Sequence, residues 1–340
     1  MWFEYTDAFG RPSPLAQVTR TYQDNAPSGS YDGAMRSFTV DIGGPVFVAD
    51  YGGTGPNVVL LHGLGGSHLN WMSVGSELAK TFRVLAPDLP GFGWTPSAGR
   101  QASIAANVRL VEELIRGLEG GPTLLMGNSM GGLIALGVAA GRSDLLSGLV
   151  LIDPALPVPP AELLRLDPVA FRFVAAYVLP RFGEYLFSRT AVALGPEGLV
   201  RSTLARCTVD WRRVDAHMVR AMIDLERARF EKPNWHEAVL EGTRSIVQTL
   251  MARKHVQRWI RSVSAPTLLM HGAKDGIVRV SASRAASDIR PDWEYVEFVD
   301  AGHVPMMEIP AAFLESVDDW LAGVTELRPF VASDGTAATA

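Results

Sequence analysis

Gly127-Asn128-Ser129-Met130-Gly131-Gly132 is the stretch of sequence that decides the fold. It follows the apolar run 123–126 and precedes a run of small and apolar residues, 133–140, that favours a helix. A strand, a sharp turn with serine at its tip and a helix together form a nucleophile elbow. Glycine two positions before and two after the serine fits this turn, because side chains there would collide. The stretch therefore predicts a nucleophile, Ser129, at the start of a helix whose N-terminus favours negative charge.

Short apolar strands alternate with amphipathic helices on both sides of this turn. The predicted strands cover residues 35–42, 46–51, 57–62, 82–86, 123–126, 149–152, 267–271 and 295–299. The predicted helices between and after them cover residues 70–80, 104–118, 133–140 and 311–321. This alternation is typical of an α/β fold, in which helices cover both faces of a mostly parallel sheet.

The pattern changes at Pro157, where three prolines precede about 100 residues without a convincing strand. Helical spacing returns at residues 161–178, 197–207, 216–230 and 235–253. We interpret residues 157–262 as a helical cap inserted between the two parts of the core, 35–156 and 263–325. Residues 1–34 are predicted to be an N-terminal extension without an assigned role, and the small, polar tail 326–340 is predicted to be disordered.

Composition limits the class of protein. The chain has 340 residues, 47% of them apolar, and a net charge of -5, which gives no reason to expect a nucleic-acid partner. The single cysteine, Cys207, excludes an intramolecular disulfide and a cysteine-rich metal site. The N-terminus shows no basic and apolar secretory signal, and no stretch has the length of a membrane span, so we expect a cytoplasmic protein without stable membrane insertion.

A serine hydroxyl needs a base to take its proton, and the base needs an acid to orient it. His303 follows the last predicted strand, and Asp275 follows the strand before it, so both reach the sheet edge where Ser129 emerges. We predict His303 as the base and Asp275 as the acid. Asp153, which also follows a strand, remains the alternative acid, although its place before Pro154 is explained by a turn.

The predicted oxyanion hole consists of two backbone N–H groups. Met130 supplies one, because it follows the nucleophile at the helix start, and Leu64, between glycines after the strand 57–62, supplies the other. Gly63, Val304 and Met306 are predicted to line the substrate site beside them. These neighbours and the aromatic and aliphatic residues of the cap favour an apolar acyl or alcohol group.

Other polar residues receive structural predictions. Asp88 is interpreted as a turn carboxylate. The remaining histidines are interpreted as structural or surface residues: His62, His68, His217, His236, His255 and His271. The cap arginines are interpreted as a solvated helical face, with binding of an anionic substrate group as the alternative: Arg212, Arg213, Arg220, Arg227 and Arg229.

Five motifs together resemble the α/β-hydrolase superfamily: residues 62–65 (His-Gly-Leu-Gly), 88–93 (Asp-Leu-Pro-Gly-Phe-Gly), the elbow 127–132, the loop 272–275 and Gly302-His303. The resemblance covers about residues 45–155 and 264–322 and is weak in the cap. It implies an eight-stranded, mostly parallel sheet with a helical cap over the active site. It also implies a hydrolase that needs no metal or organic cofactor.

Within this superfamily, the residue at the elbow limits which reactions are expected. Related epoxide hydrolases and haloalkane dehalogenases carry aspartate at the elbow, which Ser129 argues against. Carbon–carbon bond hydrolases share the Gly-Asn-Ser-Met-Gly-Gly elbow, but they tend to carry tryptophan soon after the histidine, where this chain has Val304 to Glu308. We therefore expect a serine hydrolase of small or medium apolar carboxylic esters.

Several alternatives stay open: a carbon–carbon bond hydrolase, a lactonase, a thioesterase or a perhydrolase. A non-enzymatic ligand receptor is disfavoured by the intact set of Ser129, Asp275 and His303. The sequence leaves the oligomeric state undetermined.

Overall fold

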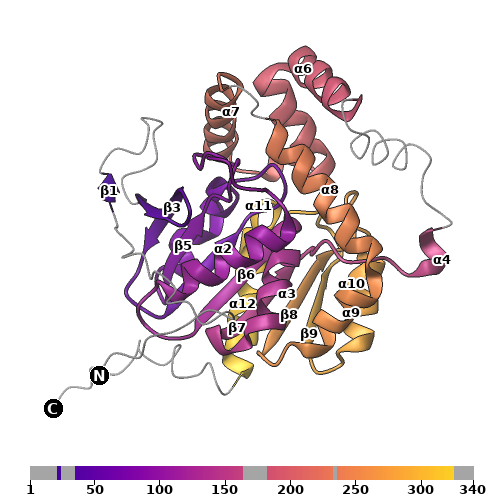
Figure 1. Cartoon of the computed structure of the whole chain (residues 1–340). Helices are drawn as coiled ribbons and strands as arrows, with labels where there is room; N and C mark the ends of the chain where they lie inside the picture. The colour runs from indigo at the N-terminus through magenta and orange to yellow at the C-terminus, as the bar shows by residue number, and fades with distance from the viewer. Residues whose placement is uncertain (1–20, 24–34, 164–181, 233–235, 325–340) are drawn as a thin grey trace, which may run out of the picture.

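The computed structural model describes residues 21–23, 35–163, 182–232 and 236–324, and a single twisted sheet forms its centre (Figure 1). The strands are β1 (Thr21–Gln23), β2 (Arg36–Asp41), β3 (Pro45–Gly52), β4 (Asn57–Leu61), β5 (Arg83–Pro87), β6 (Thr123–Asn128), β7 (Leu146–Ile152), β8 (Thr267–Gly272) and β9 (Glu294–Phe298). Their order is β1-β2-β3-β5-β4-β6-β7-β8-β9. The six strands from β4 to β9 run parallel, and β1, β2 and β3 are added antiparallel.

Strands β2 to β9 confirm the expected eight-stranded, mostly parallel sheet. The three-residue strand β1 adds a ninth and lies within the segment expected to be an extension. The central strands read as continuous apolar runs because both of their faces are covered. In β4, for example, Val59 and Leu61 pack in one apolar cluster, while Val58 and Leu60 pack in the cluster on the opposite face.

Helices cover both faces of this sheet. One face carries α2 (Ile104–Arg116), α3 (Met130–Arg142), α9 (Arg253–Ser262) and α10 (Val280–Ile289). The other carries α1 (Met72–Leu78), α11 (Pro305–Glu308) and α12 (Pro310–Gly323). Helices α3, α10 and α11 each follow a parallel strand, and the loops before them lie at one edge of the sheet.

Helices α6 (Phe182–Cys207), α7 (Ala216–Phe230) and α8 (Glu237–Met251) lie above that edge in Figure 1, and α4 (Pro160–Leu163) precedes them. Helix α6 is kinked where Gly195 adopts a φ of 65° before Pro196. The predicted helix 161–178 lies mostly outside the described residues.

The link from cap to core is clearest at α8. Glu241 Oε2 accepts a hydrogen bond from the N–H of Ala102 (3.0 Å), and Ser245 Oγ accepts one from the N–H of Ile104 (2.9 Å). These are donors at the start of α2, which have no acceptor within the helix itself. Helix α9, in contrast, buries Val256 and Ile260 in the core cluster. We therefore propose that the cap ends near Ala252, before α9, rather than at residue 262.

Candidate active site

The elbow has the strained geometry that its sequence predicts. Ser129 sits at φ 55° and ψ -114°, between the end of β6 and the first residue of α3. A Cβ atom at Gly127 would lie 2.3 Å from the carbonyl oxygen of Gly131, and one at Gly131 would lie 2.3 Å from that of Leu61. Both positions therefore exclude any side chain. A non-glycine residue at positive φ is uncommon and costs energy, which the surrounding sheet and helix offset.

His303 and Asp275 form a direct hydrogen bond. Nδ1 of His303 lies 2.6 Å from Oδ2 of Asp275, across the two loops that follow β9 and β8. Both side chains are almost fully buried. Burial alone would raise the pKa of Asp275, but the charge of His303 and hydrogen bonds from His271 and His303 hold that pKa well below its usual range. Asp275 is therefore an anion that can orient an imidazole and support its positive charge.

Asp153 lies beside this pair in a different environment. It is fully buried, adopts a φ of 44°, and accepts a hydrogen bond from the N–H of Gly272 (2.8 Å). Burial, together with the charge of Asp275, raises the pKa of Asp153 well above its usual value despite the opposing charge of His271. Of the two acids, only Asp275 makes a hydrogen bond to His303 among the described residues. The geometry favours Asp275 as the orienting acid.

His271 completes this buried cluster. Its Nε2 lies 3.3 Å from Asp275 Oδ2 and 3.5 Å from Asp153 Oδ1, and its Nδ1 lies 2.7 Å from Ser283 Oγ. Atoms of Asp153, Asp275 and His303 come within 4.8 Å of one another, as metal ligands would. Within this group, His303 Nδ1 is hydrogen-bonded to Asp275 Oδ2, and Asp153 Oδ1 accepts from the N–H of Gly272.

Asn128 connects the elbow to the histidine loop. Its Nδ2 donates to the carbonyl oxygen of His303 (2.9 Å) and to that of Ile152 (3.2 Å). The neighbour of Ser129 therefore fixes the backbone of His303 on the same edge of the sheet. Sequence reasoning did not assign this role to Asn128, although its place inside the elbow was the available signal.

The residues of the predicted oxyanion hole lie on two sides of Ser129. Met130 is the first residue of α3, so its N–H is one of the four that lack an acceptor within the helix. Leu64 follows Gly63, and a Cβ atom at Gly63 would lie 3.1 Å from Ser129 Cβ. Helix α8 covers both residues, since a Cβ atom at Gly242 would lie 2.7 Å from Leu64 Cδ1 and 3.6 Å from Met130 Sδ.

The other predicted pocket residues are buried. Val304 is 4% exposed, and Met306, on α11, is fully buried within the apolar cluster on the α12 face. Val304 belongs to the same cluster, and the place of both residues in a substrate pocket stays a prediction. Gly63 keeps its place beside Ser129.

Asp88 and His68 do more than shape a turn. Both are fully buried, and Asp88 Oδ1 accepts from the N–H of His68 (2.6 Å), while its Oδ2 accepts from that of Trp94 (2.8 Å). The ring Nδ1 of His68 lies 3.0 Å from both carboxylate oxygens. Beside this pair, His62 Nε2 accepts from the N–H of Leu89 (3.0 Å). These contacts fix the loops after β4 and β5, next to the proposed oxyanion hole.

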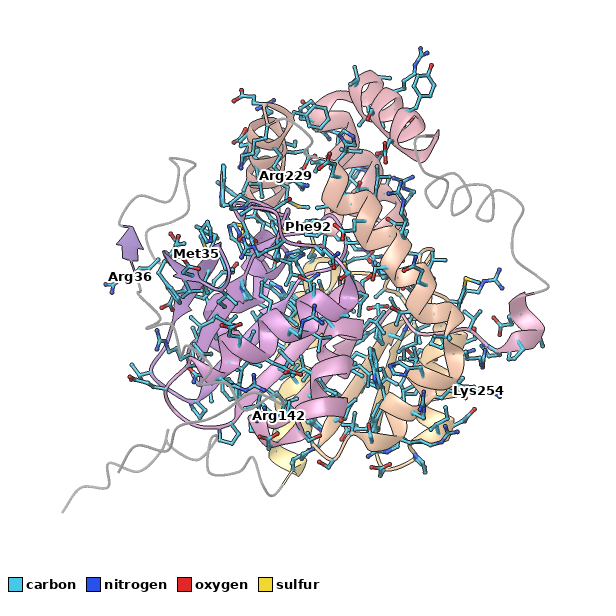
Figure 2. All side chains as sticks on the ribbon, viewed as in Figure 1. Met35, Arg36, Phe92, Arg142, Arg229 and Lys254 are labelled. Carbon is cyan, nitrogen blue, oxygen red and sulfur yellow. The ribbon has the colours of Figure 1, made fainter. Side chains whose placement is uncertain are left out.

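The cap arginines separate into two groups. Arg213 is partly exposed and binds Asp300. Arg229, labelled at the lower end of α7 in Figure 2, is 5% exposed and pairs with Glu226 at 3.1 Å. The pKa of His62 is lowered mainly by its burial, and the nearby charge of Arg229 lowers it further. The expectation of a solvated face is therefore wrong for Arg229.

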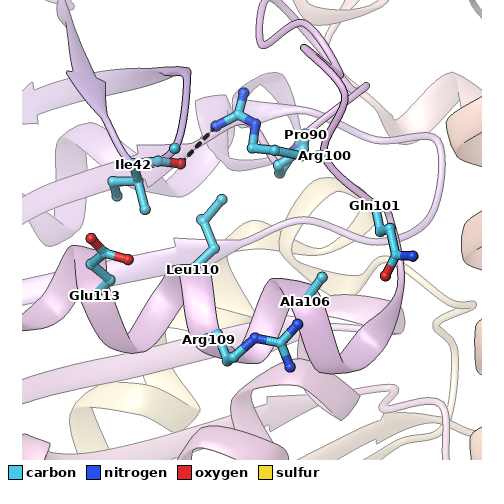
Figure 3. Close-up of a pocket in the computed structure, with 9 residues that line it drawn as sticks. Ile42, Pro90, Arg100, Gln101, Ala106, Arg109, Leu110 and Glu113 are labelled. Atoms are coloured by element: carbon cyan, nitrogen blue, oxygen red, sulfur yellow. Dashed lines mark hydrogen bonds between the residues drawn. The ribbon is translucent and has the colours of Figure 1, made fainter. Parts of the chain in front are cut away.

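A shallow depression of about 310 Å³ lies elsewhere, between α2 and the β2–β3 turn (Figure 3). Its lining includes Arg100, Arg109 and Glu113, and none of the candidate catalytic residues. The guanidinium of Arg100 donates to the carbonyl oxygens of Ile42, Gly44, Pro45, Pro96 and Ser97. This arginine therefore joins two loops of the core, which is a structural role.

The fold, the elbow and the buried histidine–aspartate pair together define a hydrolase of the α/β type. The model of the alpha/beta hydrolase family matches residues 58–316, and the chain belongs to that family. Among the helices of the described residues, none is both long and apolar enough to cross a bilayer.

Similar proteins include both ester and carbon–carbon bond hydrolases. A 2-hydroxy-6-oxo-6-(2'-aminophenyl)hexa-2,4-dienoic acid hydrolase of Metapseudomonas resinovorans is 29% identical, over 79% of this chain and 85% of that protein. A pimeloyl-[acyl-carrier protein] methyl ester esterase of Vibrio atlanticus is 26% identical, over 77% and 92%. A solved serine hydrolase involved in carbazole degradation is 25% identical, has a TM-score of 0.64, and aligns with 86% of this chain and 100% of that one.

Proposed function

We propose that this protein is a serine hydrolase of small or medium apolar carboxylic esters. The observation that carries the proposal is the strained Ser129 elbow on the same sheet edge as the His303–Asp275 hydrogen bond. Asn128 joins these two parts through its bond to the His303 carbonyl oxygen. The proposed location remains the cytoplasm, on the sequence argument alone.

The proposed reaction proceeds in two acyl transfers. His303 takes the proton of Ser129 Oγ as the oxygen attacks the ester carbonyl, and the N–H groups of Leu64 and Met130 stabilise the oxyanion. The bond to the alcohol oxygen then breaks, and His303 gives its proton to the leaving alcohol. Water, deprotonated by His303, attacks the acyl-enzyme, and the proton returns to Ser129 as the carboxylic acid leaves. Asp275 orients the ring throughout and supports its positive charge.

The apolar residues over the site favour an apolar substrate group. Gly242 of α8 packs directly on Leu64 and Met130, so this part of the cap approaches the proposed oxyanion hole closely. Such a covered, apolar site suits a substrate with a single polar group at its reacting carbonyl.

Hydrolysis of a p-nitrophenyl ester series, from acetate to decanoate, tests this proposal with wild type and Ser129→Ala side by side. We expect turnover with a chain-length optimum in wild type and a loss of roughly 10⁶-fold in kcat in the variant. Equal hydrolysis by the two folded proteins would contradict the role of Ser129.

A carbon–carbon bond hydrolase is the second candidate, because a relative with that activity aligns with most of the chain. A wild type that reacts at Ser129 with a fluorophosphonate but cleaves no ester would favour this candidate. Vinylogous diketone substrates of the meta-cleavage type would then be the next measurement.

A further inference from the structure

A cap segment is docked on the loop that carries His303. We call residues 207–213, the end of α6 and the turn after it, the docking segment, and residues 300–304 the histidine loop. The N–H of His303 donates to the carbonyl oxygen of Cys207 (2.6 Å). Gly302 lies so close that a Cβ atom there would be 2.4 Å from the same oxygen. The histidine loop therefore packs against cap backbone, with no space for a side chain between them.

Glu308 forms a second connection between these two parts. It is 3% exposed, and its Oε1 accepts hydrogen bonds from the N–H groups of Val209 (2.8 Å) and Asp210 (3.0 Å) of the docking segment. Its Oε2 accepts from the N–H of Gly302 (2.8 Å) in the histidine loop. One buried carboxylate thus satisfies three backbone donors from two segments about 90 residues apart in sequence. Bonds of this kind are short and stronger than neutral ones.

Arg213 adds an outer connection at the surface. Its guanidinium donates to the carbonyl oxygen of Asp300 (3.0 Å) and to Asp300 Oδ2 (2.7 Å), and it lies 3.7 Å from Glu308 Oε1. Lys274 Nζ donates to the second carboxylate oxygen of Asp300 (2.6 Å). Lys274 is the neighbour of Asp275, so these contacts link the loops of both proposed catalytic partners to the cap.

We propose that Glu308 is a positioning residue that keeps His303 in register with Asp275 by holding the histidine loop against the docking segment. This inference rests on the proposed function, in which His303 is the base. The position of the docking segment and the position of His303 then depend on each other. A displacement of about 1 Å at a reacting group can cost on the order of 10²-fold in rate, so a loosened loop is expected to have a measurable effect.

The test is Glu308→Gln in the full chain, with kcat and KM of ester hydrolysis measured separately. A glutamine of the same shape has one acceptor oxygen, so its NH₂ group must face an N–H of one of the two segments. We expect kcat to fall about 10- to 100-fold with KM changed less than about threefold. This split between kcat and KM is the readout, because a general loss of cap structure would raise KM as well. A folded variant with wild-type kcat would overturn the proposal.

Glu241→Gln is the matched control. Glu241 also joins a cap helix to a backbone N–H of the core, but at α2 rather than at the histidine loop. We expect its kcat to stay within about threefold of wild type; a loss of kcat equal to that of Glu308→Gln would mean that any loosened cap has this effect and would overturn the specific role.

Arg213→Gln decides the matter if circular dichroism shows that Glu308→Gln does not fold. Arg213 is partly exposed, so this variant should fold, and it loses the bonds to Asp300. A smaller fall in kcat at nearly unchanged KM supports the proposal, and a wild-type kcat overturns it. If wild type itself neither hydrolyses esters nor reacts with a fluorophosphonate at Ser129, the proposed function has failed, which is a separate result.

Discussion

Two buried carboxylates compete for the role of acid beside His303, and their surroundings separate them. Asp275 receives hydrogen bonds from two histidines and from the N–H groups of Ile277 (2.6 Å) and Val278 (3.0 Å), all of which favour its anion. Asp153 receives one backbone N–H at Oδ1, and its Oδ2 has no hydrogen-bond partner among the described residues. Two carboxylates this close do not both ionise readily in a buried site. We therefore expect Asp153 to hold a proton while Asp275 remains charged.

This difference predicts opposite outcomes for two matched substitutions. Asp275→Asn should lower kcat by roughly 10⁴-fold, because an amide leaves His303 without an anionic partner and disfavours the required tautomer. Asp153→Asn should change kcat by less than about tenfold, because asparagine has the shape and the donor of a protonated aspartic acid. Steady-state hydrolysis by both variants is the measurement, and a greater loss in Asp153→Asn would assign the acid to Asp153.

At this scale the sequence predicts the residues whose chemistry is local and leaves out those whose role depends on distant contacts. Ser129 is marked by its own glycines, and His303 and Asp275 by their places after strands. Glu308 looks like an ordinary helix residue until the structure brings Val209 and Gly302 to its two oxygens. Asn128 likewise acquires its role through a bond to His303, 175 positions away.

Helix α8 packs on the two residues of the proposed oxyanion hole through Gly242. One turn earlier on α8, Ala238 lies equally close to the core: a Cβ atom at Gly91 would be 2.3 Å from the Cβ of Ala238. Small residues at positions 238 and 242 are one turn apart on the same face, so the helix can lie flat on the core. Intrinsic helix preference opposes glycine here, which indicates that packing determines the residue.

Gly242→Ala should therefore impair the reaction while improving helix propensity. The added methyl group would lie 2.7 Å from Leu64 Cδ1, so Leu64 or α8 must move. We expect kcat/KM to fall about 5- to 50-fold, because the N–H of Leu64 is displaced from the oxyanion.

Gly141→Ala in α3 is the control for that helix substitution. A Cβ atom there would lie 3.7 Å from Glu112 Oε1, an ordinary contact at an exposed position. We expect unchanged kinetics and an unfolding free energy higher by about 0.5–1 kcal/mol. Unchanged kinetics in Gly242→Ala as well would contradict the close packing of α8 on Leu64.

The end of the cap lies between two consecutive helices. The sequence predicts this boundary at residue 262, shortly before the strand pattern returns at residue 267. The structure places a break at Ala252, with ψ 44°, after which α9 turns its apolar side toward α3. Because this change of backbone angle places ten residues against α3, we propose Ala252 as the end of the cap.

For the whole molecule, the acid pair predicts how stability depends on pH. Because the pKa of Asp153 is raised, the native state retains a proton that the unfolded chain releases above about pH 4. Its contribution to stability is fully present below that value and is lost as pH rises toward the folded pKa. Asp275, whose pKa is depressed, has the opposite effect: its contribution is present above about pH 4 and is lost as pH falls below it.

Asp153→Asn should therefore flatten the stability profile on its neutral side. We expect thermal unfolding midpoints of variant and wild type to diverge in favour of the variant as pH rises from about 5 to about 8. Calorimetric or circular-dichroism melts across this range measure the difference. A constant difference between the two proteins at every pH would contradict a raised pKa at Asp153.

The overall architecture is predictable because the apolar pattern of the strands and the glycines at their ends both indicate the same buried sheet. Apolar strands such as β4 and β6 lie in the middle of the sheet, where both faces are buried, and their flanking glycines allow the turns at its edge. The addition of β1 is not predictable, since a three-residue pairing between Thr21–Gln23 and β2 leaves no periodic signal. The seating of the cap depends on single polar residues, among them Glu241 and Glu308, that bind distant backbone groups.

The central claim is that Ser129 is an activated nucleophile served by His303. Reaction of the full chain with a fluorophosphonate, followed by peptide mass spectrometry, measures this directly. We predict one adduct per chain, located on Ser129, with labelling at least about 10³-fold slower in His303→Gln because the base is lost. An adduct on another residue, or equally fast labelling of Ser129 without His303, would contradict it.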